Sequence, residues 1–479
     1  MPPMTRKVYS KYYTTGIGRT KMTQSLNSDT RVLPMTGLWW ASFDWARSPF
    51  YYVVVLYVFS AYFSETVIGD SARGQAIFSS TVTIAGLAMA LIAPFLGGFM
   101  DRGGAKKPVL LGLIMLLAVT SAGLGFVVPG ASYSIPLGMV LLGLAGCAYS
   151  ITELFHNALL PAAGNVRQIS VISGLGFSLG SLGAVVLLLA IIALMRSPPF
   201  GLAETDIARL SGLFSAVWML VFIVPFYLGM PDFHHPGANW RTARFFPTTW
   251  EPIKATKALF KEYPNIMRFL VARMVFMDGL NALFAISAVY VAGTLDWRQS
   301  ETAMMGIIAT CSVVVGGLSA GAIDRLFGAR NAILFELFSI TALFFFQIGI
   351  QKDSILFGLI PLSTEAANRD AFTHSADLIY IVTIVPISAL IIAAYSSCRS
   401  LLVQLSPPDK IGHFFGIYAM TSTVTVWLGP GLVAAATFLT HNQRIGFGSL
   451  AILFVAGSIL MIGVKSAAAS HGADTSSTT

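Results

Sequence analysis

Charged residues are scarce in this sequence of 479 residues, in which Asp, Glu, Lys and Arg make up 11% of the positions. Soluble globular domains carry about a quarter. Hydrophobic residues make up 55%, and the mean hydropathy is +0.73. A soluble fold has too little interior to hide so much apolar surface, so we exclude a soluble enzyme, a disordered protein and a secreted disulfide scaffold. The composition predicts a helical membrane protein with many spans.

The sequence also lacks the motifs of several kinds of enzyme and binding site. Its three cysteines lie in apolar stretches and are too widely spaced for a metal-ligand or disulfide pattern (Cys147, Cys311 and Cys398). We find no phosphate-binding loop, no cluster of metal ligands and no nucleophile elbow. These absences argue against an ATP-driven pump and against a membrane enzyme acting on lipid, and we expect no cofactor.

Twelve long apolar runs are present, each near the roughly 20 residues that a helix needs to cross a bilayer. They cover residues 37–65, 76–100, 107–129, 135–160, 168–195, 208–230, 265–294, 301–324, 329–350, 376–403, 410–439 and 443–465. The longest internal polar stretch separates six runs from six. The runs predict an all-α membrane protein with a tail (1–35), a six-helix bundle (36–230), a linker (231–264), a second six-helix bundle (265–466) and a C-terminal tail (467–479).

The placement of Lys and Arg predicts the orientation. The net charge of +8 does not indicate a nucleic-acid partner, because membrane proteins collect basic residues on cytoplasmic loops. With both termini inside, 23 of the 30 basic residues fall on the cytoplasmic side. The basic tail fits a cytoplasmic segment better than an organellar transit sequence. Within the linker, residues 250–262 fit a short surface helix or a plain solvated connection.

A repeat relates the two halves. Gly97-Gly-Phe-Met-Asp101-Arg102-Gly follows the second run, and Gly321-Ala-Ile-Asp324-Arg325-Leu-Phe-Gly follows the eighth. A weaker echo relates Asn157-Ala-Leu-Leu to Arg399-Ser-Leu-Leu, in the fourth and tenth runs. The repeats predict two equivalent bundles.

Polar side chains inside the spans are the candidates for function, because a charge at mid-helix costs about 2.5–3.5 kcal/mol. They persist where they meet a partner or a watery cavity. The candidates for solute binding are Asp44, Arg47, His156, Asn157, Asp278, Asn281 and Arg399, and Glu153 is the candidate for proton coupling. Arg273 and Glu336 are further charges well inside the spans.

Several of these residues have a structural alternative. Asp44 and Arg47, one helical turn apart, either neutralise each other or contact a solute. Arg273 lies near a helix start and can extend to the interface. Arg399 either holds a solute carboxylate or pairs with Glu153 or Asp278.

The paired Gly-x-x-Asp-Arg-x-x-Gly loops resemble the cytoplasmic loop that marks the major facilitator superfamily, a very large family of secondary transporters. The resemblance implies that the first, fourth, seventh and tenth helices line a central cavity, where most of the candidates lie. It also implies a gating latch that closes the cytoplasmic side, formed by Gly97, Asp101, Arg102, Gly321, Asp324 and Arg325. Alternatively, the charges of these loops only mark topology.

Further motifs resemble the vacuolar amino-acid effluxer-like (autophagy-related) branch of that superfamily. They are Trp40-Ala-Ser-Phe-Asp44-Trp45-Ala46-Arg47, His156-Asn157-Ala-Leu-Leu-Pro161, Arg273 with Asp278-Gly-Leu-Asn281, and Ser397-Cys-Arg399 with Gly429-Pro430. The branch pattern has Asn where this sequence has Arg47.

The branch implies secondary active transport of a small polar solute, amino acids being the implied class, by alternating access coupled to protons. We expect a monomer in the cell inner membrane, with both termini cytoplasmic, rather than in an organellar membrane. Its partners would be a small-molecule substrate, protons and the lipid bilayer. The alternative is a scaffold or assembly factor that uses the same fold without transport.

Overall fold

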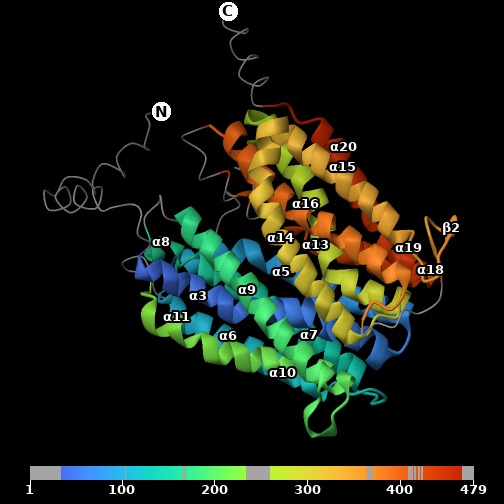
Figure 1. The fold of residues 1–479 in the computed structure, drawn as a ribbon. Helices are drawn as coiled ribbons and strands as arrows, with labels where there is room; N and C mark the ends of the chain where they lie inside the picture. The colour runs from blue at the N-terminus through green and yellow to red at the C-terminus, as the bar shows by residue number, and fades with distance from the viewer. Residues whose placement is uncertain are drawn as a thin grey trace, which may run out of the picture.

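The computed structural model describes residues 34–102, 104–164, 169–232, 259–363, 371–407 and 424–466, together with residues 414, 417, 418 and 421. The predicted tails, and most of the linker with its surface helix, lie outside these residues. The part that is described is almost entirely helical (Figure 1).

The first half of the described chain holds the N-bundle. Its elements are α3 (Met35–Phe50), η1 (Tyr51–Tyr57), α4 (Phe59–Ala61), η2 (Tyr62–Ile68), α5 (Ser71–Arg102), α6 (Lys106–Gly123), η3 (Leu124–Phe126), α7 (Ser134–Asn157), α8 (Leu160–Ala163), α9 (Ile169–Arg196), η4 (Pro199–Gly201), α10 (Glu204–Phe222) and α11 (Val224–Gly229). Elements η1 and η2 are π-helical, so the first span consists of α-helical and π-helical turns in alternation.

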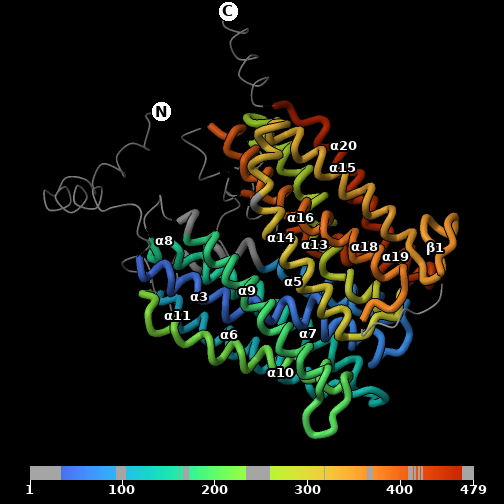
Figure 2. The backbone as a smooth tube through the Cα atoms, in the orientation of Figure 1, coloured from blue at the N-terminus to red at the C-terminus, as the bar shows by residue number. Residues whose placement is uncertain are grey.

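The second half holds the C-bundle. Its elements are α13 (Pro264–Thr294), α14 (Gln299–Phe327), α15 (Ala329–Ile348), β1 (Ser354–Ile355), β2 (Ile360–Pro361), α16 (Ser375–Leu405), α18 (Leu428–Thr440), α19 (Gln443–Gly448) and α20 (Leu450–Ile462). The two short strands pair antiparallel as a hairpin between α15 and α16. Helices α13 and α20, far apart in sequence, lie side by side (Figure 2).

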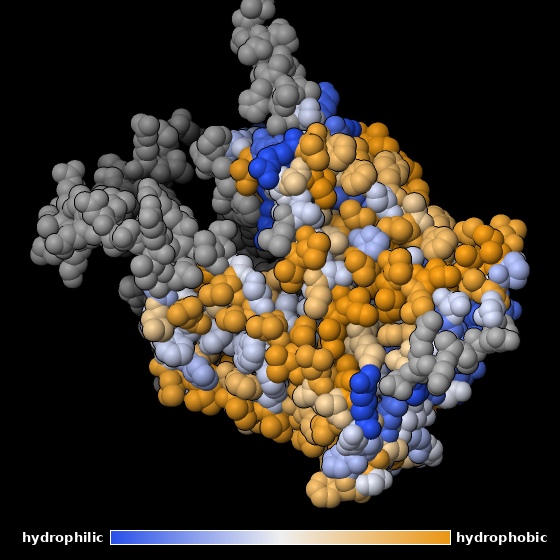
Figure 3. Space-filling model, in the orientation of Figure 1, coloured by the Kyte–Doolittle hydropathy of each residue, from blue (hydrophilic) through white to orange (hydrophobic). Residues whose placement is uncertain are grey.

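Eleven spans in the described residues are long and apolar enough to cross a membrane, and α18 is a shorter apolar helix. Their bounds agree with the predicted runs to within a few residues. The predicted eleventh run, 410–439, is described as a continuous helix only from Leu428 onward, where the Gly429-Pro430-Gly431 sequence occupies the first turn of α18. Figure 3 shows a mostly hydrophobic side surface with hydrophilic residues toward its two ends, as a bilayer requires.

Close packing inside each bundle depends on particular glycines. Helices α3 and α9 pack together, and a Cβ at Gly176 would lie 2.8 Å from the Asp44 Oδ2 atom, while one at Gly180 would lie 2.6 Å from the Ser48 Oγ atom. The Gly-x-x-x-Gly spacing in α9 therefore allows the two helices to approach closely. In α14 the glycine that closely approaches α16 is Gly316, which faces the Ala389 backbone.

The two bundles touch near the face opposite the chain ends, which we call the far face. There the Gln75 Nε2 atom donates to Thr437 Oγ1 and to the Gln443 carbonyl, both at 2.9 Å. The Ser300 N–H donates to Glu204 Oε1 at 2.8 Å. Toward the opposite face, where α3 begins and α20 ends and which we call the termini face, the described helices of the two bundles diverge (Figure 1).

Candidate functional site

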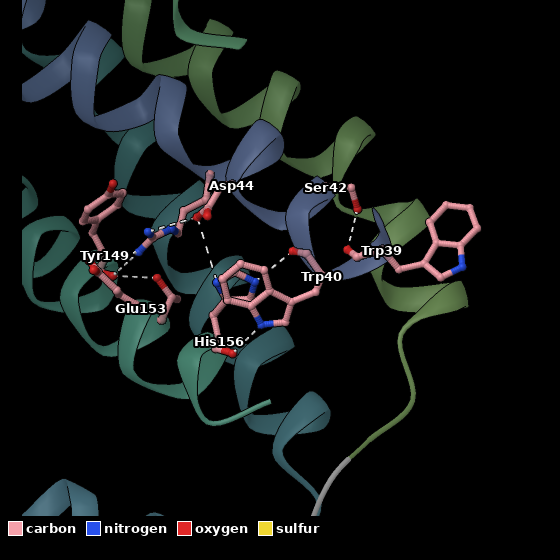
Figure 4. A network of polar contacts seen from close by, with 9 residues as sticks. Trp39, Trp40, Ser42, Asp44, Tyr149, Glu153 and His156 are labelled. Atoms are coloured by element: carbon pink, nitrogen blue, oxygen red, sulfur yellow. Dashed lines mark hydrogen bonds and ion pairs between the residues drawn. The ribbon is translucent and has the colours of Figure 1, made fainter. Parts of the chain in front are cut away.

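Arg47, in the last turn of α3, is the centre of a charged cluster in the N-bundle. It is 5% exposed, and its Nη2 atom lies 3.3 Å from Asp44 Oδ1. Its Nη1 atom donates to the Tyr149 carbonyl at 3.1 Å and lies 3.7 Å from Glu153 Oε2. The guanidinium carbon also lies 4.2 Å from the centre of the Tyr149 ring. One arginine therefore faces two carboxylates and one aromatic ring (Figure 4).

Glu153 is the exposed member of this cluster, since 54% of its side chain is accessible. On the same helix, α7, the exposed apolar residues Val140 and Leu144 form a stripe. At 3.6 residues per turn, Glu153 is rotated about 140° from Val140. We infer that Glu153 faces away from lipid and that its basic partner comes from another helix, Arg47 of α3.

His156 is packed within protein. Its ring stacks on Trp40 and Phe43, with centroids 4.0 and 4.2 Å away, and it is 1% exposed. Its Nε2 atom contacts the Trp40 carbonyl at 2.9 Å, and the Trp40 Nε1 atom donates to the His156 carbonyl at 3.0 Å (Figure 4). Its Nδ1 atom lies 3.9 Å from Asp44 Oδ1. In this conformation His156 fixes α3 against α7, whereas Asn157 is exposed at the end of α7.

In the C-bundle, Arg273 is buried and does not extend to the membrane interface, so the prediction that it reaches the interface is wrong. It is 2% exposed, and its guanidinium carbon lies 3.5 Å from the centre of the Tyr418 ring. Its Nη1 atom donates to the Tyr418 carbonyl at 3.2 Å and to Thr421 Oγ1 at 3.1 Å. Each bundle therefore holds one buried arginine stacked on a tyrosine whose carbonyl it also contacts.

Asn281 and Arg399 flank a third tyrosine, Tyr395 of α16. The Tyr395 hydroxyl donates to Asn281 Oδ1, and the exposed Arg399 donates from Nε to the Tyr395 carbonyl at 3.4 Å. The described residues contain no ion pair between Arg399 and Glu153 or Asp278. Asn281 and Tyr395 therefore connect α13 with α16 next to Arg399.

The tyrosines of this region were not predicted as site residues. Tyr51 follows Arg47 by four residues, Tyr149 precedes Glu153 by four, and Tyr395 precedes Arg399 by four. Residues four apart lie on one helix face, so this spacing was the available signal.

Asp278 serves as an acceptor for the first turn of α18. It is 2% exposed, and its Oδ2 atom accepts from the Gly429 N–H at 2.6 Å. Helix starts have unpaired N–H groups and favour a negative charge. Asp232 has the same role at α6, where it accepts from the N–H groups of Lys106 and Lys107 at 2.9 and 3.1 Å.

We expect Asp278→Ala to lower the free energy of unfolding by about 1–3 kcal/mol, because it leaves a buried N–H without an acceptor. Asp278→Asn keeps an acceptor oxygen and is expected to lie closer to the wild type. Thermal unfolding of purified protein in detergent measures both. Equal losses for the two variants would show that the charge, and not the hydrogen bond, supports α18.

The predicted latch is described only in part. Gly97, Asp101 and Arg102 lie at the end of α5, but their side chains are outside the described part of the chain. At the end of α14, the Arg325 Nε atom donates to the Gly321 carbonyl at 2.9 Å, and the side chain of Asp324 is half-buried.

A cavity of about 30 Å³ lies between Tyr57 of the N-bundle and helices α13 to α16. Its polar lining consists of Ser287, Gln347 and Ser388. This volume accommodates a water molecule or two but no solute. This cavity is therefore not a solute site.

A family model described as "Vacuole effluxer Atg22 like" matches residues 66–473. The chain belongs to this family. It is 22% identical over 428 residues to the uncharacterized MFS-type transporter YxiO of Bacillus subtilis, covering 88% of this chain and 93% of that protein. It is 25% identical over 314 residues to autophagy-related protein 22-1 of Penicillium rubens, covering 61% of this chain and 48% of the relative, so it spans about half the length of that fungal protein.

Solved structures show the same fold at low identity. A nucleoside transporter, NupG, aligns with a TM-score of 0.61 at 14% identity, covering 89% of this chain and 98% of that one. A D-xylose–proton symporter aligns with a TM-score of 0.62 at 10% identity, covering 90% and 98%. Together with the family match, these alignments make the chain a multi-pass membrane transporter of the major facilitator type and confirm the predicted fold class.

Proposed function

We propose that this transporter carries a small zwitterionic solute of the amino-acid class, by alternating access coupled to protons. The supporting observation is the opposite charge of the exposed polar groups on its two bundles. Glu153 of the N-bundle is accessible and faces away from lipid, and Arg399 of the C-bundle is exposed beside Tyr395. A solute ammonium group would pair with Glu153, and its carboxylate with Arg399.

The other candidates would shape the site around these two charges. Arg47 and Asp44 hold Glu153 in place through the ion pairs of 3.7 and 3.3 Å. Asn281 and Tyr395, already hydrogen-bonded to each other, offer an amide and a hydroxyl. His156 and Asp278 would contribute by positioning α3 and α18, and Asn157 is exposed one turn after Glu153.

Alternating access would begin from the conformation described here, in which the bundles touch at the far face and diverge toward the termini face. Closing the termini face would bring the two Gly-x-x-Asp-Arg loops toward the opposite bundle, where Gly97, Asp101, Arg102, Gly321, Asp324 and Arg325 would act as the latch. In this proposal the protein is a monomer in the cell inner membrane with both termini cytoplasmic, so that the termini face is the cytoplasmic one.

The test is uptake of labelled amino acids into proteoliposomes under an imposed proton gradient. We expect Glu153→Gln and Arg399→Gln each to raise the apparent KM about tenfold or more, because a charge-assisted hydrogen bond contributes roughly 1.5–3 kcal/mol. Arg73→Gln is the matched control, since Arg73 is exposed at the start of α5.

Uptake that survives both substitutions would refute the site. Absence of uptake in the wild type, with recovery of a stable stoichiometric membrane complex that neither substitution disturbs, would favour the scaffold alternative.

A further inference from the structure

Glu336 is a carboxylate that the proposed solute site does not use. It lies in the second turn of α15 and is 0% exposed. Its Oε1 atom accepts from the Ser397 hydroxyl at 3.1 Å. Its Oε2 atom is buried, with no hydrogen-bond partner in the described part of the chain. An ionised carboxylate out of water with one neutral donor is strongly destabilising.

Asp324 lies near Glu336 and adds a second carboxyl group to this apolar region. The two carboxyl groups interact electrostatically, and the Asp324 Oδ1 atom is also buried without a hydrogen-bond partner among the described residues. A negative charge on Asp324 further disfavours the ionised form of the Glu336 carboxyl group. The N-bundle has no acidic counterpart of Glu336. When the two halves are aligned so that Asp101 matches Asp324, the residue that matches Glu336 is Leu113.

The basic groups around Glu336 are engaged elsewhere. Helix α15 packs against α14, α16 and α20, and its other end packs against α19, which carries Arg444. Helix α20 contains no charged residue. The Arg325 Nε atom donates to the Gly321 carbonyl. The Arg330 guanidinium donates to the Ile462 and Val464 carbonyls at the end of α20 and to Asn331 Oδ1 on α15. Arg399 is exposed and donates to Tyr395. The described residues contain no ion pair with either Glu336 or Asp324.

We propose that Glu336 is a proton-binding site whose carboxyl group holds one exchangeable proton, with Asp324 as its acidic neighbour. The bound proton removes the charge of the buried Glu336 side chain and supplies an O–H group where the Oε2 atom has no hydrogen-bond partner in the described part of the chain. Asp324 is half-buried at the end of α14, so it connects Glu336 with water at the termini face.

The site also suggests how proton release is linked to movement, a step that rests on the proposed transport function. Ser397, which donates to Glu336, and Arg399 lie two residues apart on α16. When the proton leaves to water, Arg399 is the nearby cation that can turn toward the pair and restore its charge balance. Arg399 would then leave the solute, so proton release and solute release would occur together.

Infrared difference spectroscopy of the purified protein tests the site without any solute. We expect a carbonyl-stretch band of a protonated carboxylic acid at neutral pH, lost in Glu336→Gln and shifted in Ser397→Ala, which removes the hydrogen bond to Glu336. Glu301→Gln is the control, because Glu301 is a buried carboxylate of the same bundle that accepts from the N–H groups of Arg298 and Phe372, both at 2.8 Å.

Absence of the band in the wild type, or its persistence in Glu336→Gln and without a shift in Ser397→Ala, overturns the proton site whatever the protein transports. In proteoliposomes, Glu336→Gln is expected to abolish the dependence of uptake on an imposed proton gradient while exchange of solute continues. Gradient-dependent uptake in that variant would overturn the coupling step alone.

Discussion

Replacing Arg47 with glutamine is expected to lower the free energy of unfolding by about 3–5 kcal/mol, the usual effect of removing one partner of a buried ion pair. The Arg47 and Asp44 side chains are 6% and 14% exposed, so the Asp44 carboxylate would remain in an apolar span without its cation. The same substitution removes the group that holds Glu153, and we expect it to abolish solute uptake. Chemical unfolding in detergent measures the first effect, and proteoliposome uptake measures the second.

Two further variants separate charge imbalance from lost packing. Asp44→Asn in the Arg47→Gln background is expected to restore most of the stability, because it removes the unpaired charge. Arg209→Gln is the matched control: Arg209 and Asp206 form an ion pair of the same sequence spacing at 3.1 Å, with 24% and 37% of their side chains exposed. Such a pair contributes up to about 1 kcal/mol. A loss for Arg47→Gln no larger than for Arg209→Gln would contradict the buried cluster.

Replacing Gly306 with valine is expected to prevent the two bundles from closing at the far face. Gly306 lies about 10 Å from the start of α14, and any Cβ there would overlap the ring of Tyr57, a buried residue of the N-bundle. Overpacking of this kind costs about 1–3 kcal/mol, which changes the ratio of closed to open molecules roughly 5- to 150-fold. The substitution should therefore favour a conformation open at the far face.

Spin labels at Phe200→Cys and Leu359→Cys measure this change, since these exposed positions lie on far-face loops of the two bundles. The native cysteines would first be replaced with alanine. The distance between the labels is expected to lengthen in Gly306→Val. Gly317→Val on the same helix is the control, because the nearest atom to a Cβ there is 3.8 Å away. Equal distance distributions in the two variants would exclude Gly306 as a far-face contact.

The spans could be predicted from the sequence because bilayer thickness sets the length of each apolar run, and the runs are separated by polar loops. The repeated Asp-Arg loops supplied the second constraint, the division into equivalent halves. The π-helical turns of the first span could not be predicted, because hydropathy does not distinguish i to i+5 from i to i+4 hydrogen bonding.

The residues of the candidate site could be predicted from the sequence, but the residues that they contact could not. A charged residue inside a span indicates that some compensating group lies nearby. Arg47 and Glu153 were both identified as charges whose burial costs free energy. Which helix supplies that group depends on how the helices are rotated about their axes, so the pairing of Arg47 with Glu153 and the stacking of Arg273 on Tyr418 appear only in three dimensions. Asp278 shows the same limit, because its acceptor role depends on where α18 begins.

The π-helical turns η1 and η2 have a mechanical consequence for the first span. A wide turn contains more residues than an α-helical turn, and such turns occur often at functional sites. A local conversion between the two windings would change the length of this helix and the azimuth of Tyr51 and Tyr57 while both of its ends remain anchored. The first span thus has spare length in the segment where Tyr57 contacts Gly306 of the partner bundle, which would allow the bundles to tilt while that contact is kept.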